Sequence, residues 1–160
     1  MELTGDKLIV APPENVWDAL IDPGFLKRLI PGCESMTGDP ASGYDIVASR
    51  SVGNMTARLT GRIDLLDVQP GRSCRLVAAG QGGGAGAARG MALIRLAPEG
   101  GGTRLRWDIR AEVEGRLASL PNFIIEAAAR RVADGFVERF AAALEGRPAR
   151  KGLLRRLTGR

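Results

Sequence analysis

The sequence has no histidine and a single tyrosine, and aromatic residues make up only 4% of its 160 residues. Without histidine, nucleophilic catalysis by a Ser-His-Asp triad or a Cys-His pair is excluded. Its two cysteines, Cys33 and Cys74, lie far apart in the sequence, and two cysteines alone do not complete a structural zinc site. The sequence therefore argues against hydrolases of these types and against zinc proteins.

Long apolar segments are also missing. No apolar run approaches the roughly 18 residues that a membrane-spanning helix needs. The first ten residues, MELTGDKLIV, carry charges where a signal peptide would be apolar. Thiols in such a protein are expected to stay reduced, although a disulfide remains an alternative. These features predict a cytoplasmic protein, and no residue pattern calls for a metal or cofactor.

Composition and charge predict one globular domain, residues 1–145, followed by a basic tail, residues 146–160. Hydrophobic residues make up 44% of the chain and charged residues 26%, which are typical values for a globular domain. Six of the 23 cations and none of the 18 acids lie in residues 147–160, which leaves 17 cations in the rest of the chain. Because the domain itself is nearly neutral, we do not expect it to bind nucleic acid.

Hydrophobic periodicity predicts a strand, two short helices, about five strands and one long helix. The predicted elements are a strand at 2–10, helices at 14–21 and 25–30, strands at 43–52, 55–66, 72–80, 89–97 and 103–114, and a helix at 119–145. Strict alternation in 55–66 and 103–114 indicates an antiparallel sheet with one buried face. The long helix repeats apolar residues every three or four positions and is expected to cover that face. Its predicted apolar face contains Ile125, Ala129, Val132, Phe136, Phe140 and Leu144.

Small residues on the long helix leave two interpretations open. They either leave a cavity between helix and sheet or allow close packing, and packing arguments favour neither. If a cavity exists, inward-facing positions should line it. The candidates are Trp17, Met55, Leu59, Met91, Leu93, Trp107, Ile109, Phe123, Ala127 and Phe136.

The segment QGGGAGAARG, residues 81–90, holds five glycines and fits the dinucleotide pattern G-x-G-x-x-G/A at Gly82, Gly84 and Ala87. That pattern binds a pyrophosphate only when a strand precedes it and a helix follows it. Here the following segment, residues 89–97, is predicted to be a strand. The segment is therefore interpreted as a hairpin loop, or as a flexible mouth over a cavity, rather than as a nucleotide site.

Other polar residues carry no predicted chemistry. Cys33 and Glu34 are expected in a loop after Pro31-Gly32, where the carboxylate would raise the pKa of the thiol and make it less reactive. The acids of the predicted strands alternate with apolar residues and should face solvent. No two of them are placed as an acid/base pair.

Four stretches together resemble the carbon monoxide dehydrogenase G-subunit family of the START-like (SRPBCC) superfamily. They are residues 1–36, which include the segment IPGCES at 30–35, the glycine-rich QGGGAGAARGMA at 81–92, GGTRLRWDIRAEVEGRLASL at 101–120 and IIEAAARRVADGFVERFAAAL at 124–144. The motif positions carried by this resemblance are Pro31, Gly32, Cys33, Glu34, Gly82, Gly84, Gly86 and Gly90. Each stretch is weak by itself, and the set is fairly specific.

The resemblance implies an α+β helix-grip (START-like) fold, in which a curved antiparallel sheet wraps around a long C-terminal helix. It further implies a non-enzymatic accessory protein that aids the maturation or membrane association of a carbon monoxide dehydrogenase-like molybdenum hydroxylase. The wider fold implies an apolar cavity for a lipid- or quinone-like ligand. Two alternatives are a free-standing lipid or quinone carrier and a polyketide cyclase. The lack of histidine and of an acid/base pair counts against the cyclase.

The tail has the pattern of a short basic amphipathic segment. Its relevant residues are Arg147, Arg150, Lys151, Leu153, Leu154, Arg155, Arg156 and Leu157. Three roles remain open for the tail. It could make weak, reversible contact with the anionic inner face of the cytoplasmic membrane, dock on an acidic partner, or only keep the protein soluble. Longer members of the family carry an extended linker and a more hydrophobic C-terminal anchor, and this sequence departs from that pattern.

Overall fold

The computed structural model describes residues 1–52 and 55–145, without the side chains of 50–52 and 55–57. The strands are β1 (Glu2–Ile9), β2 (Cys33–Asp39), β3 (Gly43–Val52), β4 (Met55–Gln69), β5 (Ser73–Gln81), β6 (Ala87–Glu99) and β7 (Gly102–Glu114). The helices are α1 (Pro13–Leu20), α2 (Pro23–Leu29) and α3 (Asn122–Leu144), with short 3-10 turns η1 (Gly83–Ala85) and η2 (Gly115–Ser119).

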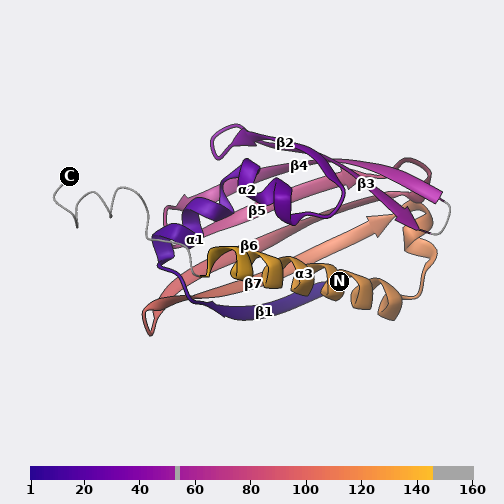
Figure 1. The fold of residues 1–160 in the computed structure, drawn as a ribbon. Helices are drawn as coiled ribbons and strands as arrows, with labels where there is room; N and C mark the ends of the chain where they lie inside the picture. The colour runs from indigo at the N-terminus through magenta and orange to yellow at the C-terminus, as the bar shows by residue number, and fades with distance from the viewer. Residues whose placement is uncertain (53–54, 146–160) are drawn as a thin grey trace.

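The strands form one curved antiparallel sheet in the order β1-β7-β6-β5-β4-β3-β2. Hairpins connect β2 through β7 in sequence, and β1 closes the far edge by pairing with β7. Figure 1 shows α3 running along the concave side of this sheet, with α1 and α2 packed near one end. This is the predicted α+β helix-grip arrangement.

The hydrophobic core is concentrated where α1, α2 and the end of α3 meet the sheet. Ile9, Val16 and Phe140 are completely buried there. Phe25 meets Phe140 edge to face, with 5.8 Å between the ring centroids. The hydroxyl of Tyr44 donates to the Ile21 carbonyl at 2.7 Å, which fixes the start of β3 to the end of α1. This end of the molecule is therefore rigidly packed.

Local sequence signals explain the two short helices. Pro13 occupies the first turn of α1, where its missing N–H leaves no helical hydrogen bond unmade. Asp22 caps α2, because its Oδ1 accepts from the backbone N–H groups of Gly24 at 2.9 Å and Phe25 at 3.2 Å. The breaks that the sequence predicts at Pro13 and Pro23 are thus present, at the starts of α1 and α2.

Helix α3 is anchored at its C-terminal half. Its buried residues are Val137, Phe140, Ala141 and Leu144. Three polar contacts reinforce this half: Lys7 Nζ lies 3.2 Å from Glu138, Arg139 Nε donates to the Leu29 carbonyl at 2.8 Å, and Glu145 accepts from Val10 N at 3.1 Å. The first half of the helix is more exposed to solvent, as shown by Val132, which is 62% exposed. The predicted apolar face is therefore wrong at Val132, and the helix begins at Asn122 rather than at residue 119.

Strand β2 was not predicted, and its presence corrects the loop assigned to Cys33 and Glu34. Cys33 pairs with Ala48 of β3 at the edge of the sheet, and Glu34 lies at the register shift between Cys33 and Ser35. Glu34 forms an ion pair with Arg58 at 3.2 Å and accepts a hydrogen bond from the Ser49 hydroxyl. The strand contains Gly38 and ends at Asp39, residues that normally disfavour strands, so its sequence carries little strand signal.

Candidate functional site

The concave face of the sheet contains a patch without large side chains. Strand register places its members on the same face as Trp107 and side by side across four strands. The small-residue patch consists of Gly61, Ala78, Gly80, Ala88, Gly90, Ala92 and Ala111. Glycines inside strands indicate a close approach or an open surface, so the sequence carries a signal for this patch that its periodicity alone does not reveal.

Large aliphatic residues surround the small-residue patch. Ile63 lies beside Ala78 in the sheet, and Leu76 and Ile109 flank Ala92. These side chains pack against the core but keep part of their surface exposed. The concave face thus offers an apolar wall and a floor of backbone and methyl groups, which suits a flat apolar ligand.

A pocket of about 260 Å³ opens at the end of this face, between β7, η2 and the start of α3. It is lined by Met1, Ala111, Glu112, Val113, Ala118, Asn122, Ile125 and Glu126. Ala111 belongs to the small-residue patch, so the pocket adjoins the concave face. The N-terminal ammonium of Met1 donates to the Ala111 carbonyl at 3.1 Å and closes one side.

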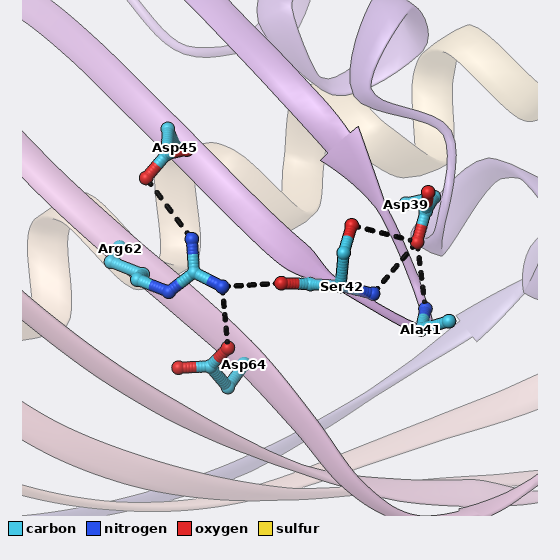
Figure 2. Close-up of polar contacts among 6 residues, drawn as sticks. All are labelled: Asp39, Ala41, Ser42, Asp45, Arg62 and Asp64. Atoms are coloured by element: carbon cyan, nitrogen blue, oxygen red, sulfur yellow. Dashed lines mark hydrogen bonds and ion pairs between the residues drawn. The ribbon is translucent and has the colours of Figure 1, made fainter.

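A second depression, of about 500 Å³, lies behind the small-residue patch on the outer face of the sheet. Its rim carries Arg62 and Arg89, and both guanidinium groups already have acidic partners. Figure 2 shows Arg62 between Asp45 and Asp64, each at 3.2 Å, and bonded to the Ser42 carbonyl. In the β2–β3 turn beside it, Asp39 accepts from Ser42 N, the Ser42 hydroxyl and Ala41 N, and these bonds to its charged form lower its pKa. These contacts fix a hairpin to the sheet and leave Arg62 with few free donors.

The glycine-rich segment forms the β5–β6 hairpin loop and not a nucleotide site, because strand β6 follows it. Gly86 has φ of 116°, and a Cβ there would lie 2.2 Å from the Glu114 carbonyl oxygen. A Cβ on Gly115, whose φ is 74°, would lie 2.9 Å from the Cα of Gly86. Glycine at both positions lets two backbones touch, and this contact sets where the chain leaves β7 for α3.

Substituting Gly86 tests this contact. We expect Gly86→Val to lower the free energy of unfolding by about 2–4 kcal/mol, through backbone strain and collision with Glu114. The matched control is Gly84→Ala, because a Cβ at Gly84 meets no atom within 4 Å. Chemical denaturation should show the control within about 0.5 kcal/mol of the original protein. Equal stability of the two variants would contradict the proposed role of the contact.

The structure places only some of the predicted cavity residues on the concave side. Trp107 lies over Gly5, where a Cβ would meet its ring at 2.4 Å, and Ile109 follows it on the same face. Phe136 is half-buried and stacks on Phe140 at 5.8 Å. Trp17 is 6% exposed and belongs to the core rather than to a cavity wall.

Other predicted cavity residues lie elsewhere. Met91 and Leu93 pair with Arg110 and Asp108 and therefore face the outer side of the sheet, which corrects their assignment. Phe123 is 71% exposed and Ala127 is also exposed, so neither lines an enclosed space. Leu59, by contrast, shares the concave face with Gly61 but is 38% exposed, and a Cβ at Gly82 would lie 2.8 Å from its Cδ2. The side chain of Met55 lies outside the described residues.

The Pro31-Gly32 motif has a structural explanation. Gly32 has φ of 76°, and a Cβ there would lie 2.0 Å from the Ser49 carbonyl oxygen. Its own carbonyl accepts from Ser49 N at 2.9 Å. The motif therefore docks the end of α2 against β3 at the sheet edge. The basic tail, residues 146–160, falls outside the described part of the chain.

Two groups in the core have strongly shifted pKa values. Burial raises the pKa of the Cys74 thiol to about 11 and that of the Tyr44 hydroxyl to about 12. Both stay protonated at neutral pH, so neither is an activated nucleophile. Within residues 1–52 and 55–145, no group of three cysteine, aspartate or glutamate residues is placed to hold a metal ion.

Alkylation should distinguish the two cysteines. Cys74 is 5% exposed, whereas Cys33 is half-buried at the sheet edge. We expect iodoacetamide at pH 8 to modify Cys33 in the folded protein and Cys74 only after unfolding. Because folding raises the thiol pKa of Cys74 above its ordinary value of 9.0, its contribution to stability is intact below that pH and declines above it. Peptide mass spectrometry identifies which cysteine is alkylated. Rapid alkylation of Cys74 in the folded protein would contradict the expected difference.

Comparison with known families identifies the chain. The model of the carbon monoxide dehydrogenase G-subunit family (CoxG) matches residues 5–145. The chain belongs to this family. The match covers every described secondary-structure element apart from the first residues of β1, including the glycine hairpin and α3. Members of the CoxG family are accessory proteins and are not known as catalysts. Among curated proteins, no sequence matches this chain.

Solved structures similar to this CoxG-family protein support its fold. A conserved protein from Geobacillus kaustophilus has a TM-score of 0.82 and 23% identity, covering 90% of this chain and 95% of that chain. A protein from Chromobacterium violaceum has a TM-score of 0.67 and 19% identity, covering 91% and 98%. The Bet v 1-like protein Ara h 8.0201 has a TM-score of 0.63 and 14% identity, covering 92% and 99%. At these identities the similarity establishes the fold alone.

Proposed function

We propose that this CoxG-family protein is a non-enzymatic accessory protein that binds a lipid- or quinone-like ligand on its concave face. The small-residue patch is the observation that carries the proposal, because it leaves room beside half-buried aliphatic walls. Binding to such a surface is favourable because it removes apolar ligand area from water, which stabilises the complex by roughly 25 cal/mol per Å². It offers few polar groups, so shape and apolar contact would select the ligand.

The partner that we propose is a carbon monoxide dehydrogenase-like molybdenum hydroxylase, whose maturation or membrane association the protein would aid. Family membership supports this partner. None of the described helices is both long and apolar enough to cross a bilayer. The membrane association that we propose is peripheral, and the basic sequence of residues 147–160 provides one means of attachment.

A free-standing lipid or quinone carrier is the second candidate function, since the concave face alone would suffice for it. A polyketide cyclase receives less support. In the described part of the chain, the groups with strongly raised pKa values are Tyr44 and Cys74, and both are buried in the core. A cyclase would need a titrating group at the ligand surface.

Native mass spectrometry of the freshly purified full chain, followed by organic extraction, tests the ligand. We expect one lipid or quinone molecule per chain, or binding of added menaquinone or fatty acid to the empty protein. Failure to bind either would contradict the ligand proposal. Affinity capture of the tagged chain from its own cells tests the partner. Enrichment of molybdenum hydroxylase subunits separates the accessory role from that of a free carrier.

A further inference from the structure

An exposed apolar surface lies at the start of α3, outside the concave site. Four large side chains within eight residues expose between 36% and 71% of their area. This apolar tip consists of Leu117, Leu120, Phe123 and Ile124. Exposed apolar residues are common singly, whereas a group of this kind indicates a contact surface. No described part of the chain covers it.

The apolar tip projects from one end of the molecule. Figure 1 shows the start of α3 at the end of the molecule opposite α1, and η2, which precedes α3, contacts η1 of the β5–β6 hairpin. The contact between Gly86 and Gly115 holds η2 at this place. The pocket of about 260 Å³ next to the tip is lined partly by Ala118 and Asn122, so the tip also borders the entrance to the concave face.

The segment that carries the apolar tip has one charged residue, Arg116, and the acids Glu114 and Glu126 flank it. Farther along the exposed side of α3, Arg130 and Arg131 are balanced in number by Glu126 and Asp134. The cation nearest the tip is therefore Arg116. An apolar group with a cation beside it can enter a surface that is negatively charged outside and apolar inside.

The area of the apolar tip helps to identify its partner. Four partly exposed side chains offer on the order of a few hundred Å². A stable protein–protein interface buries roughly 800 Å² per partner, so the tip alone is too small for one. Interfacial insertion into a bilayer requires only a few apolar side chains together with electrostatic attraction.

We propose that the apolar tip inserts into the interface of an anionic phospholipid bilayer, with Arg116 at the headgroups. The proposal rests on the peripheral membrane association proposed above, but assigns it to a different surface. Helix α3 has 23 residues, so its two ends are separated by about 34 Å. Contact through the tip would place the pocket entrance against the lipid, where an apolar ligand could exchange.

Co-sedimentation of the full chain with vesicles tests this surface. The vesicles contain phosphatidylglycerol and phosphatidylcholine, or phosphatidylcholine alone. We expect the double variant Phe123→Ser/Ile124→Ser to reduce partitioning onto the anionic vesicles by about tenfold or more. Val132→Ser is the matched control, because Val132 is a 62% exposed apolar residue of the same helix outside the tip. It should bind like the original protein.

A fluorescence measurement reports insertion directly. Phe123→Trp should shift its emission to the blue on anionic vesicles and be quenched by brominated lipids. Undiminished binding of the double variant, or no quenching of Phe123→Trp, would overturn the proposal. Loss of binding only on removal of residues 147–160 would also overturn it while leaving membrane association intact. Concentration-dependent dimerisation abolished by the double variant, without vesicle binding, would identify the tip as an interface between copies and equally overturn it.

Measuring menaquinone binding on the same variants separates this proposal from the proposed function. Ligand binding by a protein that ignores vesicles would reject the tip and retain the ligand role. Vesicle binding by a protein that holds no ligand would do the reverse. Thermal unfolding of each variant verifies that the exposed substitutions leave the fold unchanged.

Discussion

Replacing Phe140 with alanine is expected to lower the free energy of unfolding by about 3–5 kcal/mol. Phe140 is fully buried, and its ring contacts Phe25 edge to face and stacks on Phe136. Truncation removes both contacts and leaves a cavity that the surrounding helices cannot readily fill. Since a domain of this size is stabilised by only about 5–15 kcal/mol, the variant should be close to unfolding at physiological temperature.

Urea denaturation followed by circular dichroism provides the measurement for Phe140. Phe123→Ala is the matched control, because it removes the same ring from the same helix at a position that is 71% exposed. We expect the control to change stability by no more than about 0.5 kcal/mol. If both variants lost similar stability, the division of α3 into an anchored half and an exposed half would be wrong.

Filling the small-residue patch is expected to abolish ligand binding without unfolding the protein. Ala78 is half-buried on the concave face, beside Ile63 and opposite Gly90. An indole at Ala78→Trp would occupy the space over Gly90, so we expect the affinity for menaquinone or a fatty acid to fall about a hundredfold or more. This corresponds to losing the burial of one or two large apolar groups.

The neighbouring residue provides the control for Ala78. Ala79 is exposed on the opposite face of the same strand, and Ala79→Trp should bind ligand like the original protein. Isothermal titration calorimetry or quenching of Trp fluorescence measures both affinities, and circular dichroism verifies their folds. Unchanged affinity in Ala78→Trp would place the ligand elsewhere, and the site proposed on the concave face would then be rejected.

Where apolar and polar residues alternate strictly, the sequence predicted both the strand and its buried face. In β7, the alternation of Leu105, Trp107 and Ile109 with charged residues allows only one face to be buried. In β6, the run MALI at residues 91–94 has no polar partner positions, so either face satisfies the pattern. The pairing of Ile94 with Trp107 decided the face and reversed the interpretation of Met91 and Leu93.

Contacts between segments distant in sequence were not predictable in the same way. Strand β2 has a weak local propensity and is present because β3 supplies its hydrogen bonds. The glycine hairpin gave a sequence signal for positive φ, but its contact with Gly115 depends on two strands meeting. The exposure of Phe123 depends on where β7 ends and on the path that the chain then takes through η2 into α3.

The sequence by itself determined the order of elements apart from β2, the one-sided sheet and the long covering helix. These follow from local periodicity and turn residues, which act over a few positions along the chain. The family followed from the resemblance of four stretches taken together. Tertiary structure alone decided which side chains share the concave face, where the small-residue patch opens and which half of α3 is left uncovered. Those features depend on strand register and on packing between distant segments, and a shift of one residue in register would have moved each side chain to the other face.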